Sequence, residues 1–329
     1  MKRQTLKYLL ASASMAFSIS VCAQRVDYSV VSVPEESGNQ FIRITSDADC
    51  VCMPIVKRGA GGQIDWLTNR ILDTSVDGTH IAYLSARNAT TNIFIKDLSR
   101  QGSSIQRTNR SAVLDFAYSP DGKYICFSET RGATNQIFQT DARNGYVCKQ
   151  ITSGSQDYSP VYSTDMTQIF FARQEMRSVS IWSYNIGNNF LSTFSGGFNP
   201  FPVKDASAYV CARRNAMGRS EIWKIDYRTG TEECIVSDPA RSFTTPAISP
   251  DGQWIVFVGS SRIAAGQMSY MNTDIFVARL DGTGLAQITY HAADDISPVW
   301  SRDGRYIYFI SQRGSATGTA NIWRINFNY

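Results

Sequence analysis

Short apolar segments recur along the chain in a fixed order. In each copy a polar turn precedes an apolar segment such as Ile125-Cys126-Phe127, and a second segment such as Gln136-Ile137-Phe138 follows it. Segments this short, with alternating or continuous apolar character, are typical of β-strands rather than helices. The turns contain six aspartates spaced 44, 44, 40, 46 and 52 residues apart, namely Asp77, Asp121, Asp165, Asp205, Asp251 and Asp303.

The repeats predict an all-β fold, a six-bladed β-propeller of four-stranded antiparallel blades. A further strand follows the second segment in the first five repeats, but the sixth ends at Tyr329 without one. We therefore expect an N-terminal strand to close the ring. Two stretches could do so, Phe41–Thr45 and Ile64–Thr68, and we favour Ile64–Thr68.

This choice sets the expected domains. Residues 24–63 would form a strand-rich N-terminal cover segment and residues 64–329 the propeller. Within the cover, residues 28–57 are either an additional strand-rich layer or a degenerate seventh blade. The Asp-Gly turns have a local explanation, because Asp accepts backbone hydrogen bonds in a hairpin and Gly adopts positive φ. We read them as structural and not as calcium loops.

The repeat resembles the WD40-like (PD40) repeat of the TolB family. The carrying motifs are Ser119-Pro120-Asp121-Gly122 and Ser249-Pro250-Asp251-Gly252, together with Asp157-Tyr158-Ser159-Pro160 and Asp295-Ile296-Ser297-Pro298 before the innermost strands. The resemblance spans roughly residues 64–329. It implies a propeller that contacts a protein partner, while the same blades also occur in peptidases and lyases. The residues before the first blade are too few for the separate N-terminal domain of TolB.

The first residues predict export. Lys2, Arg3 and Lys7 precede an apolar stretch that ends at Ala23, so residues 1–23 read as a signal peptide. The protein would then be periplasmic or secreted; the alternative is a lipid anchor on Cys22. Removing this segment leaves 29 basic residues against 28 acidic ones. A near-neutral chain has no general attraction for nucleic acid. No later apolar run is long enough to span a bilayer.

The sequence offers little catalytic chemistry. It contains only two histidines, and it lacks a nucleophile elbow, a zinc-binding helix motif and a phosphate loop. We therefore expect no cofactor, no metal site and no catalytic residue. The cysteines of the second and fourth blades would lie two strands apart, too far for disulfides, so we expect Cys126, Cys148, Cys211 and Cys234 to be buried thiols.

The loops that join the second and third strands of each repeat carry an arginine in every unit. These arginines either pair with nearby carboxylates or form a basic rim for an anionic or acidic partner. The fifth loop is enlarged and contains Gln267 and Tyr270. We name as binding candidates on this face Arg262, Gln267, Tyr270, Asp157, Tyr158, Asp294, Asp295, Arg131 and Arg313.

The resulting hypothesis is a non-catalytic, monomeric scaffold. It would bind a protein or glycan partner of the cell envelope through the face that carries these loops. The alternative is a carbohydrate-active lyase or hydrolase that uses carboxylates in the axial funnel. That alternative requires two acids held close together with perturbed pKa values.

Overall fold

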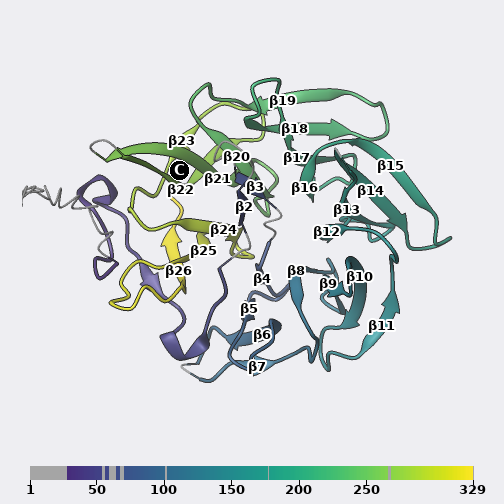
Figure 1. The fold of residues 1–329 in the computed structure, drawn as a ribbon, viewed down its shortest axis with the longest axis horizontal. Coiled ribbons are helices and arrows are strands. Elements are labelled where there is room, and N and C mark those ends of the chain that lie inside the picture. Colours follow the sequence, from purple (N-terminus) through teal and green to yellow (C-terminus); the bar gives the residue numbers. More distant parts are fainter. Residues whose placement is uncertain are drawn as a thin grey trace, which may run out of the picture.

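The computed structural model describes residues 28–53, 56–58, 64–66, 70–100, 102–176, 178–265 and 268–328. The predicted signal peptide, with Cys22, lies outside these residues. Within them, six four-stranded antiparallel sheets stand around one axis, which confirms the six-bladed propeller (Figure 1). We letter the strands of a blade a to d from the axis outward.

The first three blades follow the repeats of the sequence. Blade 1 contains β4 (Leu72–Thr74), β5 (His80–Ser85), β6 (Asn92–Asp97) and β7 (Ile105–Gln106). Blade 2 contains β8 (Val113–Tyr118), β9 (Tyr124–Arg131), β10 (Thr134–Asp141) and β11 (Val147–Gln150). Blade 3 contains β12 (Asp157–Tyr162), β13 (Gln168–Gln174), β14 (Val179–Asn185) and β15 (Leu191–Gly196).

The other three blades continue the ring. Blade 4 contains β16 (Phe198–Pro202), β17 (Ala208–Arg214), β18 (Ser220–Asp226) and β19 (Glu232–Val236). Blade 5 contains β20 (Ser242–Ile248), β21 (Trp254–Ala265), β22 (Met268–Arg279) and β23 (Ala286–Gln287). Blade 6 contains β24 (Asp295–Trp300), β25 (Tyr306–Ser311), β26 (Asn321–Asn326) and, from the N-terminal part of the chain, β1 (Ile42–Arg43).

An N-terminal strand closes the ring, as predicted, but the choice of Ile64–Thr68 was wrong. The closing strand is β1, which pairs with β26 through Ile42 opposite Arg324. The favoured segment instead contributes β3 (Ile64–Trp66), which pairs with β2 (Val56–Arg58) in a separate two-stranded hairpin. Two short 3₁₀ turns, Pro34–Glu36 and Asp47–Asp49, flank β1.

A threonine explains why β1 fits the last blade. In blades 1, 2 and 5 a threonine after the outer strand accepts the N–H of the isoleucine in strand c at 2.9 to 3.0 Å. In blade 6 Thr45 accepts the N–H of Ile322 at 2.8 Å. Phe41 packs edge-on against Phe309 at 6.2 Å between ring centroids. Both candidate stretches end in threonine, so this motif alone could not choose between them.

The innermost strands are linked to one another by polar groups at one level of the axis. In blades 3 to 6 the residue six positions before the turn aspartate has a positive φ, precedes a proline and marks a shift in strand register. The Ser159 N–H donates to Asp115 of blade 2 at 2.8 Å, and Asn199 donates from its side chain to Ser159 Oγ at 3.1 Å. The Thr245 N–H donates to Asn199 Oδ1 at 3.3 Å. The bulges of blades 3, 4 and 5 are thus hydrogen-bonded to a neighbouring blade.

The Asp turns have the predicted structural role. Asp121 accepts hydrogen bonds from Ser119 Oγ at 2.6 Å and from the Lys123 N–H at 3.1 Å, and Gly122 has a φ of +72°. Blades 3 and 4 place Met166 and Ala206 in the same left-handed conformation. These carboxylates therefore shape hairpins and are not arranged as a ligand site.

The prediction for the cysteines is correct in part. Cys126 and Cys211 are free and buried. Cys234 is free but exposed, because it faces outward from β19, whose first three residues are exposed. The expectation that it is buried was therefore wrong. The side chain of Cys148 is not among those described.

Candidate functional site

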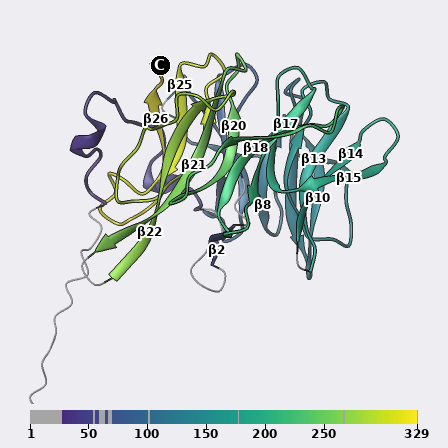
Figure 2. The same ribbon diagram turned by 90° about the horizontal axis from the view of Figure 1, so that it is seen from above.

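The connections between strands lie on two opposite faces of the ring. We call the face with the six Asp turns the turn face; it carries the a–b and c–d connections. The opposite face, with the b–c and d–a connections, is the loop face. The long hairpin of β21 and β22 projects from the loop face (Figure 2).

On the loop face, an arginine is paired with a carboxylate in five of the six b–c connections. The nitrogen–oxygen distances are between 2.7 and 3.1 Å in the pairs Arg87–Asp49, Arg131–Glu129, Arg173–Asp157, Arg213–Glu232 and Arg313–Glu36. Four of these guanidinium groups also lie over the aromatic residue that follows the isoleucine of strand c, in the pairs Arg87–Phe94, Arg131–Phe138, Arg173–Trp182 and Arg213–Trp223. This ring contact explains why an Ile-aromatic pair and an arginine recur together.

Asp157 and Tyr158 begin the innermost strand of blade 3 and are both buried. Arg173 holds Asp157 by two hydrogen bonds, Nε to Oδ1 at 2.7 Å and Nη2 to Oδ2 at 3.0 Å. Tyr158 donates its hydroxyl to Gln156 Oε1 at 3.0 Å and is also contacted by the side-chain amide of Asn135. Because both carboxylate oxygens of Asp157 accept hydrogen bonds from Arg173, this side chain has a structural role.

Arg313 and Asp295 are fully buried together with Glu36 from the N-terminal segment. Arg313 donates to Glu36 Oε2 and Oε1 at 3.1 and 3.0 Å, to Asp295, and to the carbonyl of Val31 at 3.1 Å. These contacts attach the segment before β1 to blade 6. In this structure both candidate residues join parts of the chain.

A third acid lies close to this cluster, beside Glu36 and Asp295. Asp274 on β22 is 3% exposed, and its Oδ1 has no hydrogen-bond partner among the described residues. Burial, and then the charges of Asp295 and Glu36, raise the pKa of Asp274 to about 8. Burial also raises the pKa of Asp295, against the opposing effect of Arg313. The structure thus contains a perturbed pair of acids, but it is enclosed and lines none of the described cavities.

The remaining candidates lie on or beside the long hairpin. Arg262 and Tyr270 are exposed, and Arg262 forms no ion pair with a described residue. Asp294 accepts hydrogen bonds from the N–H and hydroxyl of Thr273 at 3.0 and 2.8 Å. Gln267, which follows β21 and precedes β22 in the sequence, lies outside the described residues.

A groove crosses the loop face over blades 2 to 4, with a volume of about 910 Å³. Its lining includes Tyr158, Met176, Arg213 and Arg214. The side chain of Met176 is fully exposed. Tyr158 is the one residue among our binding candidates that appears in the described lining of this groove. Arg131 belongs to the b–c connection beside the groove.

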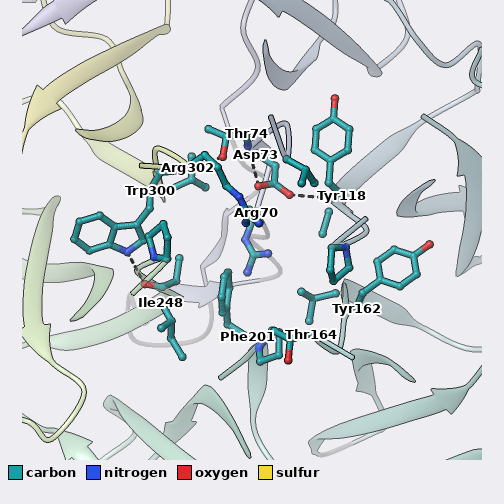
Figure 3. A pocket seen from close by; sticks show the side chains of 18 of the residues that line it. Arg70, Asp73, Thr74, Tyr118, Tyr162, Thr164, Phe201, Ile248, Trp300 and Arg302 are labelled. Atoms are coloured by element: carbon teal, nitrogen blue, oxygen red, sulfur yellow. Dashed lines mark hydrogen bonds between the residues drawn. The ribbon is translucent and has the colours of Figure 1, made fainter. Parts of the chain in front are cut away.

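The opposite end of the axis opens on the turn face as a second cavity of about 210 Å³ (Figure 3). All six innermost strands contribute to it. Arg70 lies in its middle and Phe201 and Trp300 at its sides, while Lys204 and Arg302 come from the a–b turns of blades 4 and 6. Asp73 is the only acid in its described lining, and it accepts the N–H groups of Tyr118 and Thr74, both at 2.9 Å.

Our sequence reasoning missed Arg70 and Asp73. Seven residues before each turn aspartate the repeats have Leu, Tyr, Phe, Thr or Ile, but the first has Arg70. Four residues before it they have Ala, Val or Phe, but the first has Asp73. Alignment of the six units at these inner positions would have revealed both charges.

The fold is that of the TolB-type propellers. A protein described as TolB from Agrobacterium tumefaciens matches with a TM-score of 0.61 at 16% identity, over 79% of this chain and 90% of that one. TolB from Acinetobacter baumannii matches with a TM-score of 0.58 at 16% identity, over 76% of this chain and 64% of that one. Oligogalacturonate lyase from Vibrio parahaemolyticus matches with a TM-score of 0.56 at 11% identity, over 88% and 93%.

These identities show a shared fold. Protein-family models give no match to this chain. Among the described residues, no helix is long and apolar enough to cross a membrane. The same residues contain no group of three or more histidine, cysteine or carboxylate side chains arranged to hold a metal ion.

Proposed function

We propose that the protein is a non-catalytic binding module that presents its loop face to a partner protein. The observation that carries this proposal is the groove of about 910 Å³ over blades 2 to 4, with the exposed Met176 in its lining. Tyrosine, methionine and arginine are enriched at protein interfaces. Exposed Tyr270 and Arg262 on the long hairpin add the same residue types to this face.

The charges on this face favour binding over acid–base catalysis. A general acid or base must reach its substrate. Asp157 and Asp295 are instead buried and paired with Arg173 and Arg313. These ion pairs hold the loops, while Arg262, which forms no ion pair with a described residue, is exposed and available to a partner.

We place the protein, as part of this proposal, in the periplasm or outside the cell, as a monomer. The sequence motif at residues 1–23 supports export. A lipid anchor on Cys22 is the alternative, and the mass of the intact mature chain distinguishes the two. A glycan is the alternative partner, because exposed aromatic side chains also suit sugars.

Site-specific photo-crosslinking tests the choice of face. A benzophenone side chain at position 176 or 270 should capture the same protein from cells that express the full chain. The matched control is position 144, an exposed Asn in the c–d connection of blade 2 on the turn face. Adducts from position 144 at equal yield, or none from 176 and 270, would reject the proposal.

The enzyme alternative has one observation in its favour. Asp274 and Asp295 are neighbouring acids with raised pKa values, as such a reaction requires. One of the solved structures with this fold is an oligogalacturonate lyase. Incubation with oligogalacturonate should give no unsaturated product. Product that is lost in Asp274→Asn would establish the alternative.

A further inference from the structure

Arg70 is a buried cation whose side chain makes no ion pair or hydrogen bond within the described part of the chain. Its side chain is 9% exposed, it forms no ion pair or hydrogen bond with a described residue, and its Nε is among the buried atoms that lack a hydrogen-bond acceptor. Its guanidinium carbon lies 4.4 Å from the centroid of the Phe201 ring. This contact covers one face of the guanidinium and uses none of its N–H groups. An arginine normally enters a protein interior only with acceptors for these donors.

The surroundings of Arg70 carry an excess of positive charge. Lys204 and Arg302 are exposed at the rim of the cavity and form no ion pair with a described residue. The one acid of the described lining is Asp73. Its two carboxylate oxygens accept hydrogen bonds from the backbone N–H groups of Tyr118 and Thr74. Asp115, which lines a smaller cavity together with Arg70, is likewise hydrogen-bonded, to Ser128 Oγ and the Ser159 N–H. Three cations thus face two carboxylates that are already hydrogen-bonded. An anion in the cavity would supply the acceptors that Arg70 lacks.

Part of the cavity wall is apolar. Phe201, Ile248 and Trp300 line it, and the Trp300 ring is fixed by its Nε1–H, which donates to the carbonyl of Ala247 at 3.0 Å. The volume of about 210 Å³ holds roughly seven groups the size of a water molecule, at about 30 Å³ each. The site therefore fits a small molecule with a flat apolar body and leaves no room for a folded partner.

We propose that the axial cavity of the turn face binds a small carboxylate with an apolar body. Its carboxylate accepts hydrogen bonds from Arg70, and its body lies between Phe201 and Trp300. Lys204 and Arg302 attract the anion to the opening. This site lies at the other end of the axis from the loop face, so it is independent of the proposed protein-binding surface.

Calorimetric titration of the full chain with benzoate at low ionic strength tests the proposal. Benzamide, which has the same shape and no charge, is the matched ligand control. Benzoate should bind at one site and benzamide at least about tenfold more weakly. Equal binding of the two, or no binding of benzoate, overturns the proposal. This comparison uses the unaltered protein and does not depend on the folding of a variant.

Two variants assign the site. Arg70→Met, which keeps an unbranched side chain, should weaken benzoate at least about tenfold. Lys123→Gln, which removes the charge of an exposed residue that does not line the cavity, should leave the affinity unchanged. A folded Arg70→Met protein that still binds benzoate as the original chain does overturns the assignment.

Inorganic phosphate tests the apolar part of the proposal. It carries the charge without the flat body, so it should bind at least about tenfold more weakly than benzoate. Phosphate that binds as tightly as benzoate contradicts the role given to Phe201 and Trp300.

Discussion

Two buried arginines occupy opposite environments in this propeller. Arg313, on the loop face, has Glu36 and Asp295 within ion-pair distance and the carbonyl of Val31 as a further acceptor. These contacts involve its two terminal nitrogens, while its Nε, like that of Arg70, has no acceptor among the described residues. Arg70, on the axis, has no ion pair with a described residue and contacts the ring of Phe201. The two side chains are 0% and 9% exposed.

The difference shows how to read a buried charge. A cation whose acceptors come from distant parts of the same chain holds those parts together, and it is costly to remove. A cation without acceptors lowers the stability of the empty protein and gains its acceptors from a ligand. The same residue type therefore has a structural role at one position and, by our proposal, a binding role at the other.

Removal of the charge of Arg313 should have the largest effect on stability. Arg313→Met leaves Glu36 and Asp295 buried without their cation, so the free energy of unfolding should fall by about 3–5 kcal/mol. Denaturant unfolding measures the change. Arg305→Gln, which breaks an exposed pair with Asp303, should leave the unfolding free energy nearly unchanged. Similar losses in both variants would contradict the structural role of Arg313.

The pH dependence of stability should reveal the acid beside Arg313. The pKa of Asp274 is about 8 in the folded protein, above its ordinary value of 3.8. Between these values the folded state keeps a proton that the unfolded state has released, so stability should fall as pH rises from about 4 to 8. Asp274→Asn should reduce this fall and be more stable than the original chain at pH 8 by about 1–3 kcal/mol.

Asp281 on the same blade is the control for that experiment. Hydrogen bonds from Thr283 lower its pKa, so its contribution is present above pH 4 and is lost only in more acidic solution. Asp281→Asn should keep the slope of the original chain between pH 4 and 8. An unchanged slope in Asp274→Asn would show that Asp274 is ionised in the folded protein.

Removal of the charge of Arg70 should have the smallest effect. Arg70→Met removes an unpaired buried cation and keeps the contact with Phe201, so the free energy of unfolding should change by less than about 1 kcal/mol. The same denaturant measurement as for Arg313→Met applies. A loss as large as that of Arg313→Met would mean that Arg70 has a structural role that the contacts do not show.

Much of the fold could be predicted from local patterns. Strand periodicity and the turn aspartates define six repeats, and each repeat is stabilised mainly by its own hairpins and its neighbours. The closing strand could not be chosen in this way, because Phe41–Thr45 and Ile64–Thr68 both end in threonine. The choice depends on pairing between residues such as Thr45 and Ile322, which are 277 positions apart.

The candidate site was predicted less well for a related reason. The b–c arginines are visible in the sequence, but their partners are not. Glu36, which binds Arg313, comes from outside the repeats altogether. Arg70 was recognisable as a charge at a position that is uncharged in the other five repeats, yet its lack of acceptors among the described residues depends on the packing of six strands around the axis.

The side-chain Nε–H signal of Arg70 tests the central contrast most directly. In an NMR titration of the full chain, Arg70→Met identifies this signal by its loss, and Arg313→Lys identifies that of Arg313. Benzoate should shift the Arg70 signal until it saturates and leave the Arg313 signal in place, while benzamide should move neither. An Arg70 signal that does not shift when benzoate is added, or equal shifts at both arginines, would contradict the distinction drawn between them.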